Sequence, residues 1–122
     1  MNKEVPFAVF ILGKIGSKFC ATTREDGRIG LPGGKVDLGE TPENAALRES
    51  EEEGWLYPKD TLLNLIHKQK VDNKLVFWYE ANKSPKKLNE YKEKYRKILP
   101  IRITKNQLKN SGFGNENLPI YD

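Results

Sequence analysis

The segment from Gly33 to Trp55 joins a glycine-containing loop to a short helix whose two ends are both marked in the sequence. Thr41 is a good helix N-cap, because its hydroxyl can accept a hydrogen bond from a free backbone N–H, and Pro42 suits the first helical position. The run from Ala45 to Glu53 favours helix in sum, and Gly54 is a typical residue just past a helix end. The sequence therefore predicts a helix over 42–53.

Three glutamates lie on one side of this predicted helix. At about 100° per residue, Glu49, Glu52 and Glu53 fall at i, i+3 and i+4 and span an arc of about 100°. Two carboxylates about 5.5 Å apart repel by roughly 3 kcal/mol at an effective dielectric near 20, so three at a partly buried edge need a compensating charge. A divalent cation with oxygen ligands, such as Mg²⁺, supplies that charge. The alternative is a solvated acidic face, which is the usual role of an acidic run.

Loop and helix together resemble the Nudix box, the signature of the Nudix hydrolase family. That signature reads Gly, five residues, Glu, seven residues, Arg-Glu, two residues, Glu-Glu, one residue, Gly and an apolar residue. The matching positions here are Gly34, Glu40, Arg48, Glu49, Glu52 and Glu53. One position departs from the family, because Trp55 stands where the last glycine is usual. The departure leaves the metal-facing positions intact.

The resemblance implies a fold, a reaction and a cofactor. It implies an α/β protein of the Nudix type, an α/β/α sandwich with a small mixed sheet between helices, and we expect residues 1–122 to form one such domain. Family members hydrolyse a diphosphate linkage in a nucleoside diphosphate derivative or nucleoside triphosphate. Mg²⁺, with Mn²⁺ as a substitute, neutralises the phosphate oxygens and helps water attack phosphorus.

The resemblance also implies roles for individual residues. The metal ligands would be Glu49, Glu52, Glu53 and the backbone carbonyl of Gly33. Glu52 is the predicted general base, or base and ligand together, and Arg48 is predicted to orient a carboxylate by a charge-assisted hydrogen bond. Glu40 is expected to hold the loop instead of touching metal. Predicted substrate-binding residues are Arg24, Arg28, Gly34, Lys35 and, as a carboxylate from a later loop, Glu116.

Two of these substrate assignments have plain structural alternatives. Arg28 lies in an Asp-Gly-Arg sequence that equally fits an exposed turn, and Glu116 equally fits an ordinary surface position. Aromatic residues that could stack on a base are more often core residues in strands. They are Trp55, Phe77, Trp78, Tyr79 and Phe113.

The charge of the chain favours anionic ligands. The formal net charge is +4, and the excess gathers in the segment 83–97, where Tyr91 and Tyr95 alternate with lysines. An RNA-binding interpretation follows, with the enzyme removing diphosphate or cap groups from RNA 5′ ends. A non-catalytic nucleotide-binding domain is a further alternative, although the intact acidic positions argue against it. Free nucleotides are the preferred substrate class.

The rest of the chain predicts mixed α/β structure. Strands are expected at 7–12 and 18–23 as a hairpin, at 62–71 and 75–81 as a second pair, and at 98–103, with a helix from Thr104 to about Asn110. A single cysteine, Cys20, excludes an internal disulfide and a cysteine-based zinc site. No run of about 18 apolar residues is present, so we expect no membrane partner and a cytoplasmic location, in the host if the source is viral.

Overall fold

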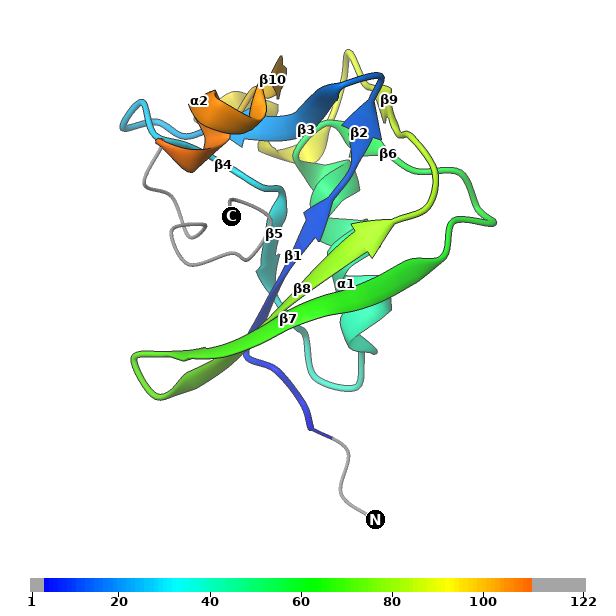
Figure 1. Cartoon of the computed structure of the whole chain (residues 1–122), viewed down its shortest axis with the longest axis vertical. Helices are drawn as coiled ribbons and strands as arrows, with labels where there is room; N and C mark the ends of the chain where they lie inside the picture. Colours follow the sequence, from blue (N-terminus) through cyan, green and yellow to red (C-terminus); the bar gives the residue numbers. More distant parts are fainter. Residues whose placement is uncertain (1–3, 111–122) are drawn as a thin grey trace.

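The computed structural model describes residues 4–110, which form a mixed α/β domain (Figure 1). None of the helices within this range is long and apolar enough to span a membrane. The elements in chain order are β1 (Ala8–Leu12), β2 (Lys14–Ile15), β3 (Lys18–Thr23), β4 (Ile29–Gly30), β5 (Gly33–Lys35), α1 (Pro42–Glu52), β6 (Trp55–Leu56), β7 (Leu63–Val71), β8 (Lys74–Ala81), β9 (Lys86–Lys87), the 3₁₀ helix η1 (Lys92–Arg96), β10 (Pro100–Ile103) and α2 (Lys105–Lys109).

A four-stranded mixed sheet in the order β5-β1-β8-β7 forms the centre of the fold. Strand β1 pairs parallel with β8 and antiparallel with β5. A second sheet has the order β10-β3-β2, with β4 also paired to β3, and β6 pairs with β9. The α/β class predicted from the sequence is therefore confirmed.

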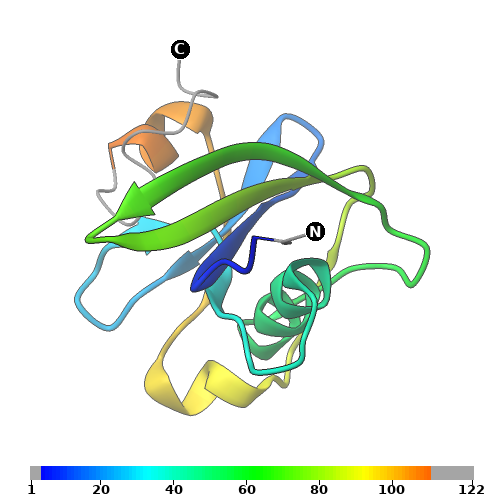
Figure 2. The same ribbon diagram turned by 90° about the horizontal axis from the view of Figure 1, so that it is seen from below.

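The central sheet separates two hydrophobic cores because successive side chains of a strand point to opposite faces. Val9 and Ile11 of β1 pack in the core that α1 covers, together with Ala45 of that helix. Leu12 packs in the other core, which contains Leu108 of α2. Figure 2 shows α1 and α2 on opposite sides of β1.

Helix α1 begins at Pro42, as predicted, and ends at Glu52, one residue before the predicted end. The Thr41 hydroxyl accepts a hydrogen bond from the Asn44 N–H at 3.1 Å, and Pro42 is the first helical residue. At the other end Gly54 has φ +106°, and a Cβ there would lie 2.6 Å from Pro100 Cγ. Glycine is needed here for both conformation and space.

Trp55, the departure from the signature, is a core residue. Its side chain is fully buried, its Nε1–H donates to the Ala21 carbonyl at 2.8 Å, and its own carbonyl accepts from the Ser50 hydroxyl at 3.0 Å. These bonds tie the end of α1 to β3. The indole therefore fixes the helix that carries the acidic residues.

The first predicted hairpin is wrong in its pairing, whereas the second is confirmed. Strand β3 pairs with the short β2, and β1 belongs to the other sheet. The chain passes from one sheet to the other at Gly13. An added Cβ there would lie 1.9 Å from the Tyr57 hydroxyl. Strands β7 and β8 pair antiparallel across Asp72 and Asn73. Both turn residues have positive φ, 52° and 65°, as a type I′ hairpin turn requires.

Candidate active site

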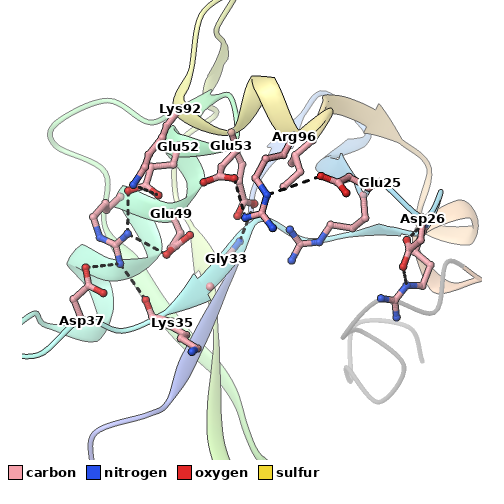
Figure 3. A pocket seen from close by; sticks show the side chains of 16 residues that line it. Glu25, Asp26, Gly33, Lys35, Asp37, Glu49, Glu52, Glu53, Lys92 and Arg96 are labelled. Atoms are coloured by element: carbon pink, nitrogen blue, oxygen red, sulfur yellow. Dashed lines mark hydrogen bonds and ion pairs between the residues drawn. The ribbon is translucent and has the colours of Figure 1, made fainter.

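One open cleft of about 820 Å³ gathers most of the predicted site residues (Figure 3). Its walls come from the segment after β3, the glycine loop at β5, the end of α1, and η1. The lining residues are Arg24, Glu25, Asp26, Arg28, Gly33, Gly34, Lys35, Asp37, Arg48, Glu49, Glu52, Glu53, Lys92, Glu93, Arg96 and Ile98. All but three of these have an ionisable side chain, and the lining contains both acidic and basic groups that suit a charged ligand.

Arg48 stands among four carboxylates on the α1 side of the cleft. Its Nη1–H donates to Glu49 Oε1 and to Glu52 Oε2, each at 3.0 Å. Its Nε–H donates to Glu40 Oε2 at 2.7 Å, and Nη2 lies 3.4 Å from Asp37 Oδ2. The bond to Glu40 is the main reason that the pKa of Arg48 is raised. One guanidinium thus holds two of the predicted metal ligands in a fixed relation to each other.

Glu40 holds the loop, as expected from the sequence. Besides the two hydrogen bonds from Arg48, its Oε1 accepts the Asp37 N–H at 3.1 Å. The Arg48 hydrogen bonds keep the pKa of this carboxyl below its ordinary value. Glu40 does not line the cleft.

Glu53 is the most buried of the three helix glutamates that face the cleft. Only 3% of the residue is exposed, and its Oε1 accepts the Gly33 N–H at 3.3 Å. Burial raises the pKa of Glu53 to about 8, although the positive charge of Arg24 acts in the opposite direction. Burial also raises the pKa of Glu49. Both carboxyls therefore lack sufficient positive charge in the protein itself.

The glycine loop approaches these carboxylates closely. A Cβ at Gly34 would lie 2.5 Å from Glu49 Cδ, and one at Gly33 would lie 2.0 Å from the Val9 carbonyl oxygen. A side chain at Gly34 would push the loop away from α1, and a side chain at Gly33 would push it away from β1. The paired glycines thus let backbone and carboxylate share one wall of the cleft.

The acidic residues fit a divalent cation in chemistry, but their present arrangement is not a finished metal site. Within residues 4–110, no group of three or more His, Cys, Asp or Glu side chains is arranged to hold a metal ion. Arg48 instead donates to oxygens of Glu49 and Glu52, and Glu53 accepts the Gly33 N–H. Oxygen donors with unbalanced negative charge suit Mg²⁺, and the roles of Gly33 and the glutamates as ligands stay predictions.

The other predicted residues divide into three groups. Arg24, Arg28 and Lys35 line the cleft with the glutamates, and Arg28 also pairs with Asp26 at 2.8 Å, as in an exposed turn. Glu116 and Phe113 lie outside the described residues. The four remaining aromatic candidates are buried in the cores; they are Trp55, Phe77, Trp78 and Tyr79. The cleft lining contributed by residues 4–110 contains no aromatic ring.

Sequence reasoning missed the contribution of η1. Lys92 and Arg96 of this element line the cleft, and Lys92 Nζ lies 3.7 Å from Glu52 Oε1. The sequence pointed to a short helix near 89–97 and to an excess of lysine in the segment 83–97. That excess did not distinguish a solvated surface from the wall of a site.

The raised pKa of Glu53 predicts a pH-dependent loss of stability in the absence of metal. The unfolded chain loses this proton near pH 4.5, whereas the folded protein keeps it to about pH 8. The free energy of unfolding therefore falls as pH rises through this window. Glu53→Gln has no proton to lose, so in excess chelator its melting midpoint should exceed that of the unaltered protein by at least about 5 °C at pH 8.

Thermal unfolding followed by circular dichroism at pH 5 and pH 8 measures this difference. The gap between the two proteins should shrink toward pH 5, where both carry a neutral side chain at position 53. A variant that melts below the unaltered protein at pH 8 would show that the carboxylate is not strained by burial.

Comparisons with known proteins agree with the site. The sequence model of the NUDIX domain matches residues 4–102. The chain is 30% identical over 111 residues to YtkD of Bacillus subtilis (strain 168), provisionally named an 8-oxo-dGTP diphosphatase, covering 85% of this chain and 70% of that protein. It is 29% identical over 83 residues to the 8-oxo-dGTP diphosphatase of Escherichia coli (strain K12), covering 63% of this chain and 64%, slightly under two thirds, of that relative.

Solved structures share the fold. A structure from work on MutT of Aliivibrio salmonicida and Vibrio cholerae matches with a TM-score of 0.65 and 22% identity, covering 95% of this chain and 93% of that one. A NUDIX family hydrolase from Clostridium perfringens matches with a TM-score of 0.61 and 21% identity, covering 94% and 91%. The chain belongs to the NUDIX domain family, as its signature residues predicted, and is a hydrolase that acts on diphosphate bonds.

Proposed function

We propose that the protein is a magnesium-dependent pyrophosphohydrolase of nucleoside triphosphates, with 8-oxo-dGTP as the first candidate substrate. The observation that carries the proposal is the convergence of Glu49, Glu52 and Glu53 on one cleft that also contains basic side chains. Carboxylates there suit a divalent cation, and the basic groups suit phosphate oxygens. The two relatives named for 8-oxo-dGTP support this choice of substrate.

Under this proposal Glu49, Glu52 and Glu53 hold Mg²⁺, with Mn²⁺ as a substitute, and Gly33 adds its carbonyl. When bound, the cation neutralises the phosphate oxygens that otherwise repel a nucleophile. A carboxylate oxygen of Glu52 takes a proton from the attacking water as the water oxygen bonds to phosphorus. The bridging P–O bond then breaks, and the leaving phosphate departs with that electron pair.

Two further groups of residues position the reactants. Arg48 keeps the side chains of Glu49 and Glu52 in fixed orientations through its two 3.0 Å hydrogen bonds. Arg24, Arg28 and Lys35 line the same cleft and are the proposed contacts of the phosphate chain, and Gly34 lets the loop lie directly against Glu49. Arg48 thus fixes two of the proposed metal ligands before substrate arrives, and such preorganisation is a main source of catalysis in phosphoryl transfer.

A substrate panel tests the proposal. The protein is incubated with Mg²⁺ and, separately, 8-oxo-dGTP, dGTP, ADP-ribose, a dinucleoside tetraphosphate and an RNA with a 5′ triphosphate, and the products are identified by mass. The proposal predicts the highest kcat/KM for the nucleoside triphosphates, with 8-oxo-dGTP first. Turnover of ADP-ribose or of the RNA end alone, or of none of the compounds, would contradict it.

A further inference from the structure

The 3₁₀ helix η1 brings two cations to the cleft from outside the signature segment. Lys92 and Arg96 are four residues apart on this element, and both line the cleft. Figure 3 shows Lys92 beside Glu52 and Arg96 between Glu53 and Glu25. The two side chains therefore follow the cleft from the α1 carboxylates toward the segment after β3.

Both cations make long ion pairs and stay accessible. Lys92 Nζ is 3.7 Å from Glu52 Oε1, and Arg96 is 3.4 Å from Glu93 and 3.9 Å from Glu25. Their side chains are 66% and 55% exposed. Because both cations are more than half exposed and each contact is 3.4 Å or longer, an entering phosphate can compete with the carboxylates for them.

Arg48 differs from these two cations. It makes three contacts of 2.7 to 3.0 Å with the carboxylates of Glu40, Glu49 and Glu52, and the main one raises its pKa. Its positive charge is already used in these contacts with the acidic residues. The side chains of η1 are therefore better suited to exchange partners when an anionic ligand enters.

The side chains that line the cleft restrict which part of a substrate can lie along η1. Within residues 4–110 the lining is charged apart from Gly33, Gly34 and Ile98, and it contains no aromatic ring. A second nucleoside or a sugar gains most from aromatic and apolar contacts, whereas a phosphate gains from paired cations. A terminal phosphate therefore fits the space beside Lys92 and Arg96 better than a bulky group does.

We propose that Lys92 and Arg96 bind the terminal phosphate of a nucleoside triphosphate and so set a preference for triphosphates over diphosphates. The inference rests on the proposed function, because it places the phosphate nearest the glutamates at the site of reaction. From there the next phosphate along the chain comes within reach of Lys92, which is already 3.7 Å from Glu52. The two residues determine specificity and leave the chemical step to the α1 glutamates.

The test compares the double variant Lys92→Gln/Arg96→Gln with a matched control, Lys86→Gln/Lys94→Gln. Both lose two positive charges. Lys86 is exposed on β9, and Lys94 shares η1 but pairs with Glu90 at 2.9 Å and does not line the cleft. None of the residues in η1 is buried, so the fold should survive both changes.

The measurements are KM and kcat for dGTP with Mg²⁺, and the inhibition constant of dGDP against dGTP turnover. In the double variant we expect KM for dGTP to rise at least about 10-fold, because charge-assisted bonds to the terminal phosphate are lost. The inhibition constant of dGDP and kcat should change less than about 3-fold. The exchange Lys92→Arg/Arg96→Lys keeps both positive charges, so its KM for dGTP should be lower than that of the double variant. The control should match the unaltered protein.

Three outcomes would overturn the inference. An unchanged KM for dGTP would remove Lys92 and Arg96 from the phosphate site. If KM for dGTP and the inhibition constant of dGDP rose by the same factor, Lys92 and Arg96 would attract anions in general and would not recognise the terminal phosphate. Inability of the unaltered protein to hydrolyse any triphosphate would overturn the proposed function as well, whereas the first two outcomes leave that function standing.

Discussion

Glu53→Gln is expected to lower turnover at least about 100-fold while leaving the fold intact. Glutamine has nearly the same shape and can still accept the Gly33 N–H, so the 3.3 Å hydrogen bond is retained. The lost group is the buried negative charge that the divalent cation needs. Steady-state kcat with Mg²⁺ and a nucleoside triphosphate measures the effect, with circular dichroism to confirm folding.

The same helix offers a matched control for this variant. Glu51 is exposed and does not line the cleft, so Glu51→Gln removes one negative charge from α1 without touching the site. We expect the control to retain turnover within about 2-fold, as for most surface substitutions. Near-normal kcat in Glu53→Gln, or equal losses in both variants, would refute the metal assignment.

The second large effect is a strict requirement for Mg²⁺ or Mn²⁺. Arg48 carries one positive charge against the carboxylates of Asp37, Glu40, Glu49 and Glu52, so the protein alone leaves the site short of positive charge. A substrate phosphate would add further negative charge beside them. Excess chelator should therefore reduce turnover below detection, and added Mg²⁺ should restore it.

The chelator experiment has its own control. A chelator already saturated with Ca²⁺ or Zn²⁺ would introduce other cations, so the comparison is with the same ionic strength of an inert salt. Turnover that persists in excess chelator, after dialysis against it, would show that the glutamates act without a cation. The mechanism proposed for Glu52 would then need a different source of positive charge.

Local signals in the sequence predicted most of the elements that position the site. Thr41 caps α1 as expected, and the helix predicted from Thr104 forms with Thr104 as its N-cap; each cap joins residues three apart in the chain. The β7–β8 turn is likewise set by two adjacent residues. Helical spacing alone placed Glu49, Glu52 and Glu53 on one side of α1, and the cleft confirms that they face it together.

Contacts between distant segments could not be predicted in this way. The change of sheet occurs at Gly13, which packs against Tyr57, a residue 44 positions later in the chain. The approach of Lys92 to Glu52 joins two segments 40 residues apart, and no periodic pattern marks it. Long-range packing decides such contacts. The acidic side of the cleft could therefore be predicted from the sequence, whereas the wall formed by η1 could not.

Binding of Mn²⁺ measured by electron paramagnetic resonance, with Mg²⁺ as competitor, tests the central claim most directly. The account predicts that the unaltered protein and Glu51→Gln bind Mn²⁺ equally, that Mg²⁺ displaces it, and that Glu53→Gln weakens binding at least about 10-fold. Equal Mn²⁺ affinity in Glu53→Gln and Glu51→Gln would contradict the account, because the buried carboxylate would then take no part in holding the cation.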